Sequence, residues 1–158
     1  MERFKGTWKP LCAVDVSPLV KWITSIPLAD WPQQDRLSAD YPYPAMVSNP
    51  DWCGFKDRTD PLVGRIMEWF PGMRPDHRML SIVIPGQRIA EHDDVQGEDW
   101  RVRVHVPLVT NPDAIMFFGS EGVHLDVGTA YLVNTEVPHS LHNLGSDPRI
   151  HFFFDVRS

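Results

Sequence analysis

The segment WRVRVHVP, residues 100–107, alternates polar with apolar side chains. Successive side chains of a β-strand point to opposite faces of a sheet. The valines should therefore face a core, while Arg101, Arg103 and His105 share the opposite face. This pattern predicts a strand over Trp100–Thr110 with polar side chains lined up on one side.

The remainder of the second half of the chain shows the same short-strand character. Glycine and proline turn signals separate the segments. Short strands at close, regular intervals are typical of sandwiches and barrels. We expect a mainly β protein, a small antiparallel jelly roll with a few N-terminal helices packed on one sheet. The other predicted strands are Met79–Pro85, Ala114–Phe118, Val123–Leu125, Thr129–Thr135, Ser140–Leu144 and Ile150–Val156.

Residues 1–78 are predicted to be helical or irregular. Ser17-Pro18 is a typical N-cap with proline at the first helical position, and Pro27 ends the apolar stripe that follows. Thr59-Asp60-Pro61 is expected to cap a second helix. Its buried side would comprise Leu62, Val63, Ile66, Met67, Trp69 and Phe70.

Between these helices, five prolines in residues 27–50 exclude a regular interior element and predict a long ordered loop or short extended pieces. A loop of this length is often functional, so it is a candidate lid or substrate wall. Trp31, Tyr41, Tyr43 and Trp52 are its candidate wall residues, although each has a simpler interpretation as structural packing.

Length and composition limit the possible functions. A chain of 158 residues fits one domain over 1–158 with one core. The net charge of −6 gives no reason to expect nucleic acid or an anionic membrane as partner. The N-terminus lacks the apolar core of a signal peptide, so a cytoplasmic location is expected. Cys12 and Cys53 are expected to be free thiols.

A candidate metal site lies after the first predicted strand of this half. His92 and Asp94 are two positions apart, so on an extended segment both project to one side. His139 follows much later, far enough along the chain to come from a strand on the other side of a barrel. Two imidazoles and one carboxylate leave coordination positions open, as in non-haem Fe(II) oxygenases. Zinc remains an alternative for the same ligands.

The last predicted strand is apolar on one face, and its other face carries Arg149, His151, Phe153 and Asp155. A strand covered on both faces places Arg149 in the interior, where its charge must be neutralised. We therefore expect an anionic partner for this arginine.

Several of these residues together resemble the aspartyl/asparaginyl β-hydroxylase family of Fe(II)/2-oxoglutarate-dependent oxygenases. The resemblance covers roughly residues 79–156. It rests on Trp100–Asp113, His124–Gly128, Asn134, His139–Asn143 and Arg149–Asp155. The resemblance implies a double-stranded β-helix fold.

The resemblance also implies an iron site formed by His92 and His139, with Asp94 completing the triad as in the free-proline hydroxylases of the family. Asp93 is a minority alternative to Asp94.

By the same resemblance, Arg149 would bind the distal carboxylate of the cosubstrate 2-oxoglutarate, with Arg103 and His105 holding it too. O2 would be the second cosubstrate, and succinate and CO2 the coproducts. A small molecule, an amino acid or derivative, is the expected substrate, with a peptide residue as an alternative.

Two other classes of function remain open. One is a cupin-like metal enzyme that does not use 2-oxoglutarate, and the other is a non-catalytic jelly-roll binding module. Of the remaining histidines, His124 is expected to be structural or exposed and His142 to face away from the metal. For His151 a pocket role and buried packing are equally favoured. Asn143 would fix the strand backbone or contact the cosubstrate.

Overall fold

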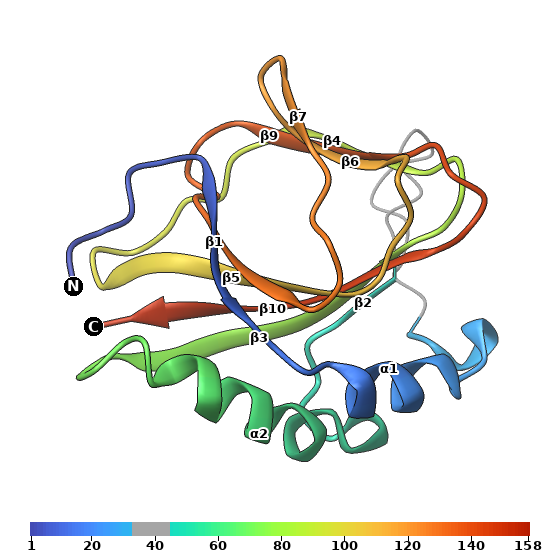
Figure 1. Ribbon diagram of the computed structural model, residues 1–158, viewed down its shortest axis with the longest axis horizontal. Coiled ribbons are helices and arrows are strands. Elements are labelled where there is room, and N and C mark those ends of the chain that lie inside the picture. The colour runs from blue at the N-terminus through green and yellow to red at the C-terminus, as the bar shows by residue number, and fades with distance from the viewer. Residues whose placement is uncertain (33–44) are drawn as a thin grey trace.

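Two antiparallel sheets form the body of the molecule in the computed structural model, which describes residues 1–32 and 45–158. The larger sheet has the order β1 (Trp8–Ala13), β8 (Thr129–Val133), β5 (Trp100–Val109), β10 (Arg149–Arg157), β3 (Arg74–Val83) and β2 (Ala45–Val47). The smaller sheet has the order β4 (Arg88–His92), β9 (His139–Asn143), β6 (Ala114–Phe118) and β7 (Glu121–Val123). Figure 1 shows the two sheets facing each other. The predicted jelly roll is confirmed.

Two α-helices cover the outer face of the larger sheet, as predicted. Figure 1 places α1 (Ser17–Thr24) and α2 (Phe55–Met67) on the side of this sheet that is turned away from the smaller one. They contact β5 and β3 respectively. Two 3₁₀ turns, η1 (Leu28–Asp30) and η2 (Trp52–Gly54), flank the segment 33–44. The predicted roles of Tyr41 and Tyr43 lie outside the described residues.

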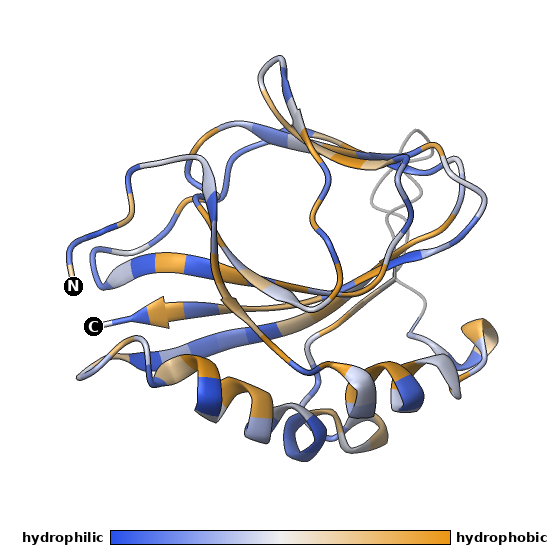
Figure 2. Cartoon of the chain, viewed as in Figure 1, coloured by the Kyte–Doolittle hydropathy of each residue, from blue (hydrophilic) through white to orange (hydrophobic). Residues whose placement is uncertain are grey.

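The main core lies between the larger sheet and these helices. Val102, Val104 and Val106 of β5 are fully buried in it, together with Phe152 and Phe154 of β10. Figure 2 shows apolar and polar residues alternating along β5. The other face of the larger sheet looks toward the smaller sheet, where a second apolar cluster includes Val83 and Leu141. The predicted alternation thus sorts β5 into a core face and a polar face.

Both helices begin differently from the prediction. Ser17 is the first residue of α1 rather than its N-cap, and its backbone N–H donates to the Asp15 side chain over 3.0 Å. Helix α2 begins at Phe55, so Pro61 lies inside it. Phe55 is 1% exposed and packs edge-on against Phe152. This burial stabilises the extra turn, whereas the proline removes one backbone donor.

The predicted burial of Trp69 was wrong. Its side chain lies just beyond the end of α2 and is 59% exposed, whereas Phe70 is buried. The helical periodicity ends at Met67, so the two aromatic residues no longer share the apolar face of the helix.

Three strands were not predicted. β1 lies in the part expected to be helical or irregular, and its Pro10 and Cys12 bracket a register shift against β8. An edge strand tolerates proline because one of its sides needs no ladder hydrogen bonds. β2 has only three residues, and β4 ends at His92 without a clear alternation. In the described part of the chain, no helix combines the length and apolar character needed to cross a bilayer.

Candidate metal centre

A cavity of about 580 Å³ lies between the two sheets. Polar side chains from both sheets reach it, and thioether, aliphatic and aromatic groups form the rest of its wall. The cavity is lined by all six predicted site residues, which are His92, Asp94, Arg103, His105, His139 and Arg149.

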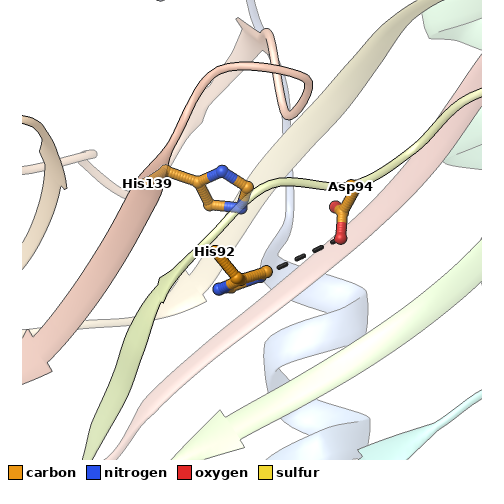
Figure 3. A group of neighbouring side chains, drawn as sticks. All are labelled: His92, Asp94 and His139. Carbon is orange, nitrogen blue, oxygen red and sulfur yellow. Dashed lines mark ion pairs between the residues drawn. The ribbon is translucent and has the colours of Figure 1, made fainter.

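His92 and His139 meet at one edge of the smaller sheet. His92 ends β4 and His139 begins β9, and the two are direct partners in the antiparallel ladder. With Asp94 they form a group whose potential ligand atoms all lie within 4.8 Å of one another. Figure 3 shows the three side chains converging. His139 therefore comes from the neighbouring strand, and the expectation of a strand across the barrel was wrong.

The ring orientation of both histidines suits metal binding. His92 Nδ1 lies 2.8 Å from the carbonyl oxygen of Ala90, and His139 Nδ1 lies 2.8 Å from that of Val137. A carbonyl can only accept, so each Nδ1 carries the proton and each Nε2 keeps its lone pair free. Metal-binding histidines are typically fixed by such a second hydrogen bond.

The third member of the group, Asp94, is positioned by its backbone and its side chain. Its N–H donates to the carbonyl oxygen of Thr135 over 2.8 Å, and its Oδ2 accepts from Arg103. Its Oδ1 lies 3.9 Å from His92 Nε2. Asp93 is exposed and does not belong to the group. The geometry favours Asp94 over Asp93 as the carboxylate ligand.

Burial favours the neutral form of His139. Removal from solvent lowers the pKa of this imidazole below its ordinary value, and the nearby His92 lowers it further. The hydrogen bond to Val137 opposes this shift. A neutral imidazole is the form that binds a metal ion.

Arg149 lies in the same cavity and is 4% exposed. Burial lowers the pKa of its guanidinium to about 9. Within residues 1–32 and 45–158, no carboxylate forms an ion pair with it. A buried, unpaired guanidinium is costly, and an anionic ligand would offset that cost with paired hydrogen bonds. The residues present thus fit both a divalent metal and an organic anion beside it.

His105 lines the cavity next to this arginine. Burial, and then the charge of Arg149, hold its pKa well below the ordinary value, and its Nδ1 has no hydrogen-bond partner in the described structure. Its ring stacks on Phe153 at a centroid distance of 5.0 Å. Arg103 is already paired with Asp94 and with Asp155.

The remaining polar residues fall outside the metal group. His142 packs its ring against Phe117, away from the cavity, as predicted. Asn143 is fully buried and donates to the carbonyl oxygens of Val83 and Asp147, so it fixes the backbone. His151 is buried behind His105 at a ring distance of 5.9 Å. His124 is half-buried, and its Nε2 lies 3.3 Å from Asp126 Oδ1.

Several cavity residues were not predicted. Met46, Met79 and Met116 line it, and no periodicity distinguishes them from ordinary core residues. Buried Thr135 reaches it from the turn after β8. His77 reaches it from a register shift between β3 and β10, with a left-handed φ of 51°. Such bulges redirect side chains near active sites, but alternation alone does not reveal them.

The fold has relatives among solved structures. SnoN, described as a non-heme alpha ketoglutarate dependent epimerase from nogalamycin biosynthesis, aligns with a TM-score of 0.71 and 14% identity over 96% of this chain and 76% of that chain. AviO1 from Streptomyces viridochromogenes Tue57 aligns with a TM-score of 0.63 and 10% identity over 96% of this chain and 90% of that chain. A Pseudomonas putida prolyl-4-hydroxylase aligns with a TM-score of 0.62 and 14% identity over 95% of this chain and 91% of that chain. At these identities the likeness shows the fold.

Sequence comparison is more specific. No curated protein matches the chain. The family model for aspartyl/asparaginyl beta-hydroxylases, however, matches residues 56–158, which is more than half of the chain and includes every residue of the metal group. The chain therefore belongs to the aspartyl/asparaginyl beta-hydroxylase family and is an oxygenase that works with Fe(II) and 2-oxoglutarate.

Proposed function

We propose that the protein hydroxylates an unactivated carbon of an amino acid or an amino-acid residue. In this proposal His92, Asp94 and His139 hold Fe(II). When bound, Fe(II) and 2-oxoglutarate would together supply the oxidative chemistry that inserts one oxygen atom of O2 into a C–H bond, with succinate and CO2 as coproducts. The protein contributes binding, orientation and exclusion of water.

The observation that carries the proposal is the placement of two kinds of site in one cavity. Three side chains that could hold a metal ion line the same cavity as Arg149, a buried guanidinium without an acidic partner in the described residues. A guanidinium matches a carboxylate with two parallel donors and keeps its charge when a lysine would lose it. Arg149 would bind the distal carboxylate of 2-oxoglutarate, and the free Nδ1 of His105 would bind the cosubstrate too.

The cavity wall supports a small substrate. The cavity, with a volume of about 580 Å³, must hold both the cosubstrate and the substrate group that reacts. Three methionines form part of the wall, and their flexible thioethers adapt to irregular apolar shapes. These features favour a free amino acid or derivative with an aliphatic side chain over a bulky folded substrate.

A substrate screen tests this function. Purified protein, Fe(II) and 2-oxoglutarate would be incubated with individual free amino acids, proline included, and with short peptides containing the same residues. The expected result is substrate-dependent succinate formation together with a product heavier by one oxygen atom. His139→Ala should form neither product, and His142→Ala, which alters the same strand on its other face, should form both.

An oxidised product without one equivalent of succinate would contradict the use of 2-oxoglutarate. Turnover of the peptides alone would retain the hydroxylase and exclude the free amino acid as substrate.

A further inference from the structure

Asp155 is a fully buried carboxylate on the cavity side of β10, with 0% exposure. Its Oδ1 accepts from Arg103 Nε over 2.8 Å and from Trp100 Nε1 over 3.2 Å, and its Oδ2 accepts from Arg103 Nη2 over 3.1 Å. The pairing with Arg103 is therefore bidentate, which is the strongest and most directional form of this contact. These hydrogen bonds fix the orientation of the Asp155 carboxylate.

The guanidinium of Arg103 connects this buried carboxylate to the metal group. Its remaining nitrogen, Nη1, donates to Asp94 Oδ2 over 2.7 Å. The Arg103 side chain is itself packed against the Phe153 ring, with Cζ 5.1 Å from the ring centroid. One planar group thus joins two carboxylates, one buried in the protein and one at the cavity.

Because of this connection, the two carboxylate oxygens of Asp94 have different contacts. Oδ2 accepts a hydrogen bond from Arg103, whereas Oδ1 lies 3.9 Å from Nε2 of His92, another residue of the potential metal group. If Asp155 were neutral, Asp94 would be the only carboxylate partner of the Arg103 guanidinium among the described residues. Asp94 would then be drawn toward Arg103 and away from the metal, because a single carboxylate would have to neutralise the buried charge.

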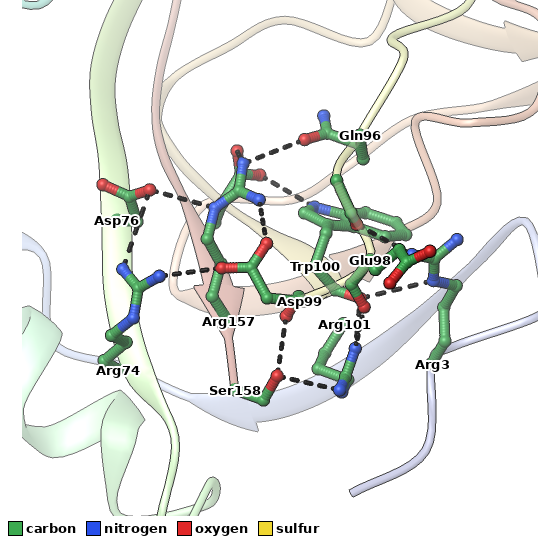
Figure 4. A network of polar contacts seen from close by, with 12 residues as sticks. Arg3, Arg74, Asp76, Gln96, Glu98, Asp99, Trp100, Arg101, Arg157 and Ser158 are labelled. Carbon is green, nitrogen blue, oxygen red and sulfur yellow. Dashed lines mark hydrogen bonds and ion pairs between the residues drawn. The ribbon is translucent and has the colours of Figure 1, made fainter.

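Two other arginines, Arg157 and Arg3, hold the segment that follows Asp94. Arg157 pairs with Asp99 over 3.0 Å and with Asp76 over 2.9 Å, and it donates to Gln96 over 3.2 Å, as Figure 4 shows. Arg3 donates to the carbonyl oxygen of Gly97 over 2.8 Å. These contacts hold Gln96, Gly97 and Asp99, but none of them touches the Asp94 carboxylate. Among the described residues, that carboxylate accepts its side-chain hydrogen bond from Arg103, which Asp155 holds in turn.

We propose that Asp155 is a positioning residue for the metal centre. It holds Arg103 so that the guanidinium binds Asp94 Oδ2 and leaves Asp94 Oδ1 as a single-oxygen metal ligand. This inference rests on the proposed metal ligands and adds a residue that touches neither metal nor substrate. Outer partners of metal ligands commonly change metal affinity by about 10- to 100-fold when removed.

The test is a titration of the purified protein with Co(II) alone, in which binding is followed by calorimetry and by the visible ligand-field bands of the bound ion. Asp155→Asn keeps the shape of the side chain and removes its charge. It should weaken Co(II) binding by about 10- to 100-fold. Asp76→Asn is the matched control. Asp155 lies 3.7 Å from Arg157 Nη2, and Asp76 likewise pairs with Arg157, but Asp76 does not contact Arg103. Its Co(II) affinity should equal that of the wild type.

A double-mutant cycle separates positioning from a general charge effect. In an Asp94→Ala background, Asp155→Asn should have no further effect on Co(II) affinity, because it acts through Asp94. An equal loss in both backgrounds would overturn the proposal. If Asp155→Asn does not fold, Arg103→Lys replaces it in the same cycle, because a single ammonium lacks the planar fork that bridges both carboxylates.

The outcomes also separate this inference from the proposed function. Absence of Co(II) binding by the wild type would overturn the metal site and the role of Asp155 together. Binding that is weakened by Asp94→Ala but unaffected by Asp155→Asn would overturn the role of Asp155 alone.

Discussion

His92 and His139 are direct ladder partners of β4 and β9, and their ring centroids lie 4.4 Å apart. Facing residues of an antiparallel pair project to the same side of the sheet, so the strand register itself brings the two imidazoles together. Each ring is then fixed by a hydrogen bond to the carbonyl two residues before it. The two imidazoles are therefore held by regular structure, which limits how far they can move apart, whereas Asp94 lies in the segment after β4.

Loss of one ladder partner should disable metal binding. His139→Ala is expected to weaken Co(II) binding by more than the roughly 10- to 100-fold typical of an outer partner, since it removes a proposed ligand itself. The measurement is calorimetric titration. His142→Ala serves as control, because its ring packs against Phe117 outside the cavity. Comparable losses in the two variants would show that the effect is structural rather than ligation.

The metal-free protein should lose stability as the pH falls below about 6.5, the ordinary pKa of histidine. Burial holds the pKa values of His105 and His151 well below that value in the folded state. The unfolded chain therefore takes up protons first, and the penalty grows as the pH falls toward the folded-state pKa values. Each pKa unit of depression costs about 1.4 kcal/mol once fully developed.

Thermal unfolding between pH 7.5 and pH 5.5 would measure this loss. His151→Leu should flatten the decline, because it removes a buried imidazole whose two nitrogens lack hydrogen-bond partners among the described residues. Leu144→Ala, at an exposed position without an ionisable side chain, should keep the decline of the wild type. A melting temperature independent of pH over this range would contradict the buried, neutral state of these histidines.

The contact between Phe55 and Phe152 should carry much of the stability of α2. Phe55→Ala is expected to lower the free energy of unfolding by about 3–5 kcal/mol, the usual cost of emptying a buried aromatic site. Urea denaturation measures it. Trp69→Ala, at a position that is 59% exposed, should change the stability by no more than about 0.5 kcal/mol. A larger loss at Trp69 than at Phe55 would contradict the observed packing.

Alternation and turn residues were enough to predict the jelly roll and the face shared by Arg103 and His105. Each depends on local rules, since side chains two apart on a strand share a face and glycine or proline marks its end. The interior position of Arg149 followed from the apolar residues on the opposite face of β10, and its burial confirms it.

The features that were missed depend on contacts between distant segments. The first turn of α2 is stabilised by Phe55 packing on β10, and the pairing of β1 with β8 joins segments that are far apart in the sequence. Strand adjacency was equally hidden, so His139 was assigned to the wrong side of the barrel. A register shift with left-handed backbone at His77 leaves no periodic signal.

The most direct test of the central claim is an anaerobic titration of the Fe(II)-loaded protein with 2-oxoglutarate, following the weak visible charge-transfer band of the iron chelate. The wild type should develop the band at saturating cosubstrate. Arg149→Ala should still bind Fe(II) but need a far higher 2-oxoglutarate concentration, since the buried anion partner is gone. Arg101→Ala, which alters an arginine of β5 outside the cavity, should behave as the wild type. Iron binding without the band in the wild type, or an unchanged requirement in Arg149→Ala, would contradict the account.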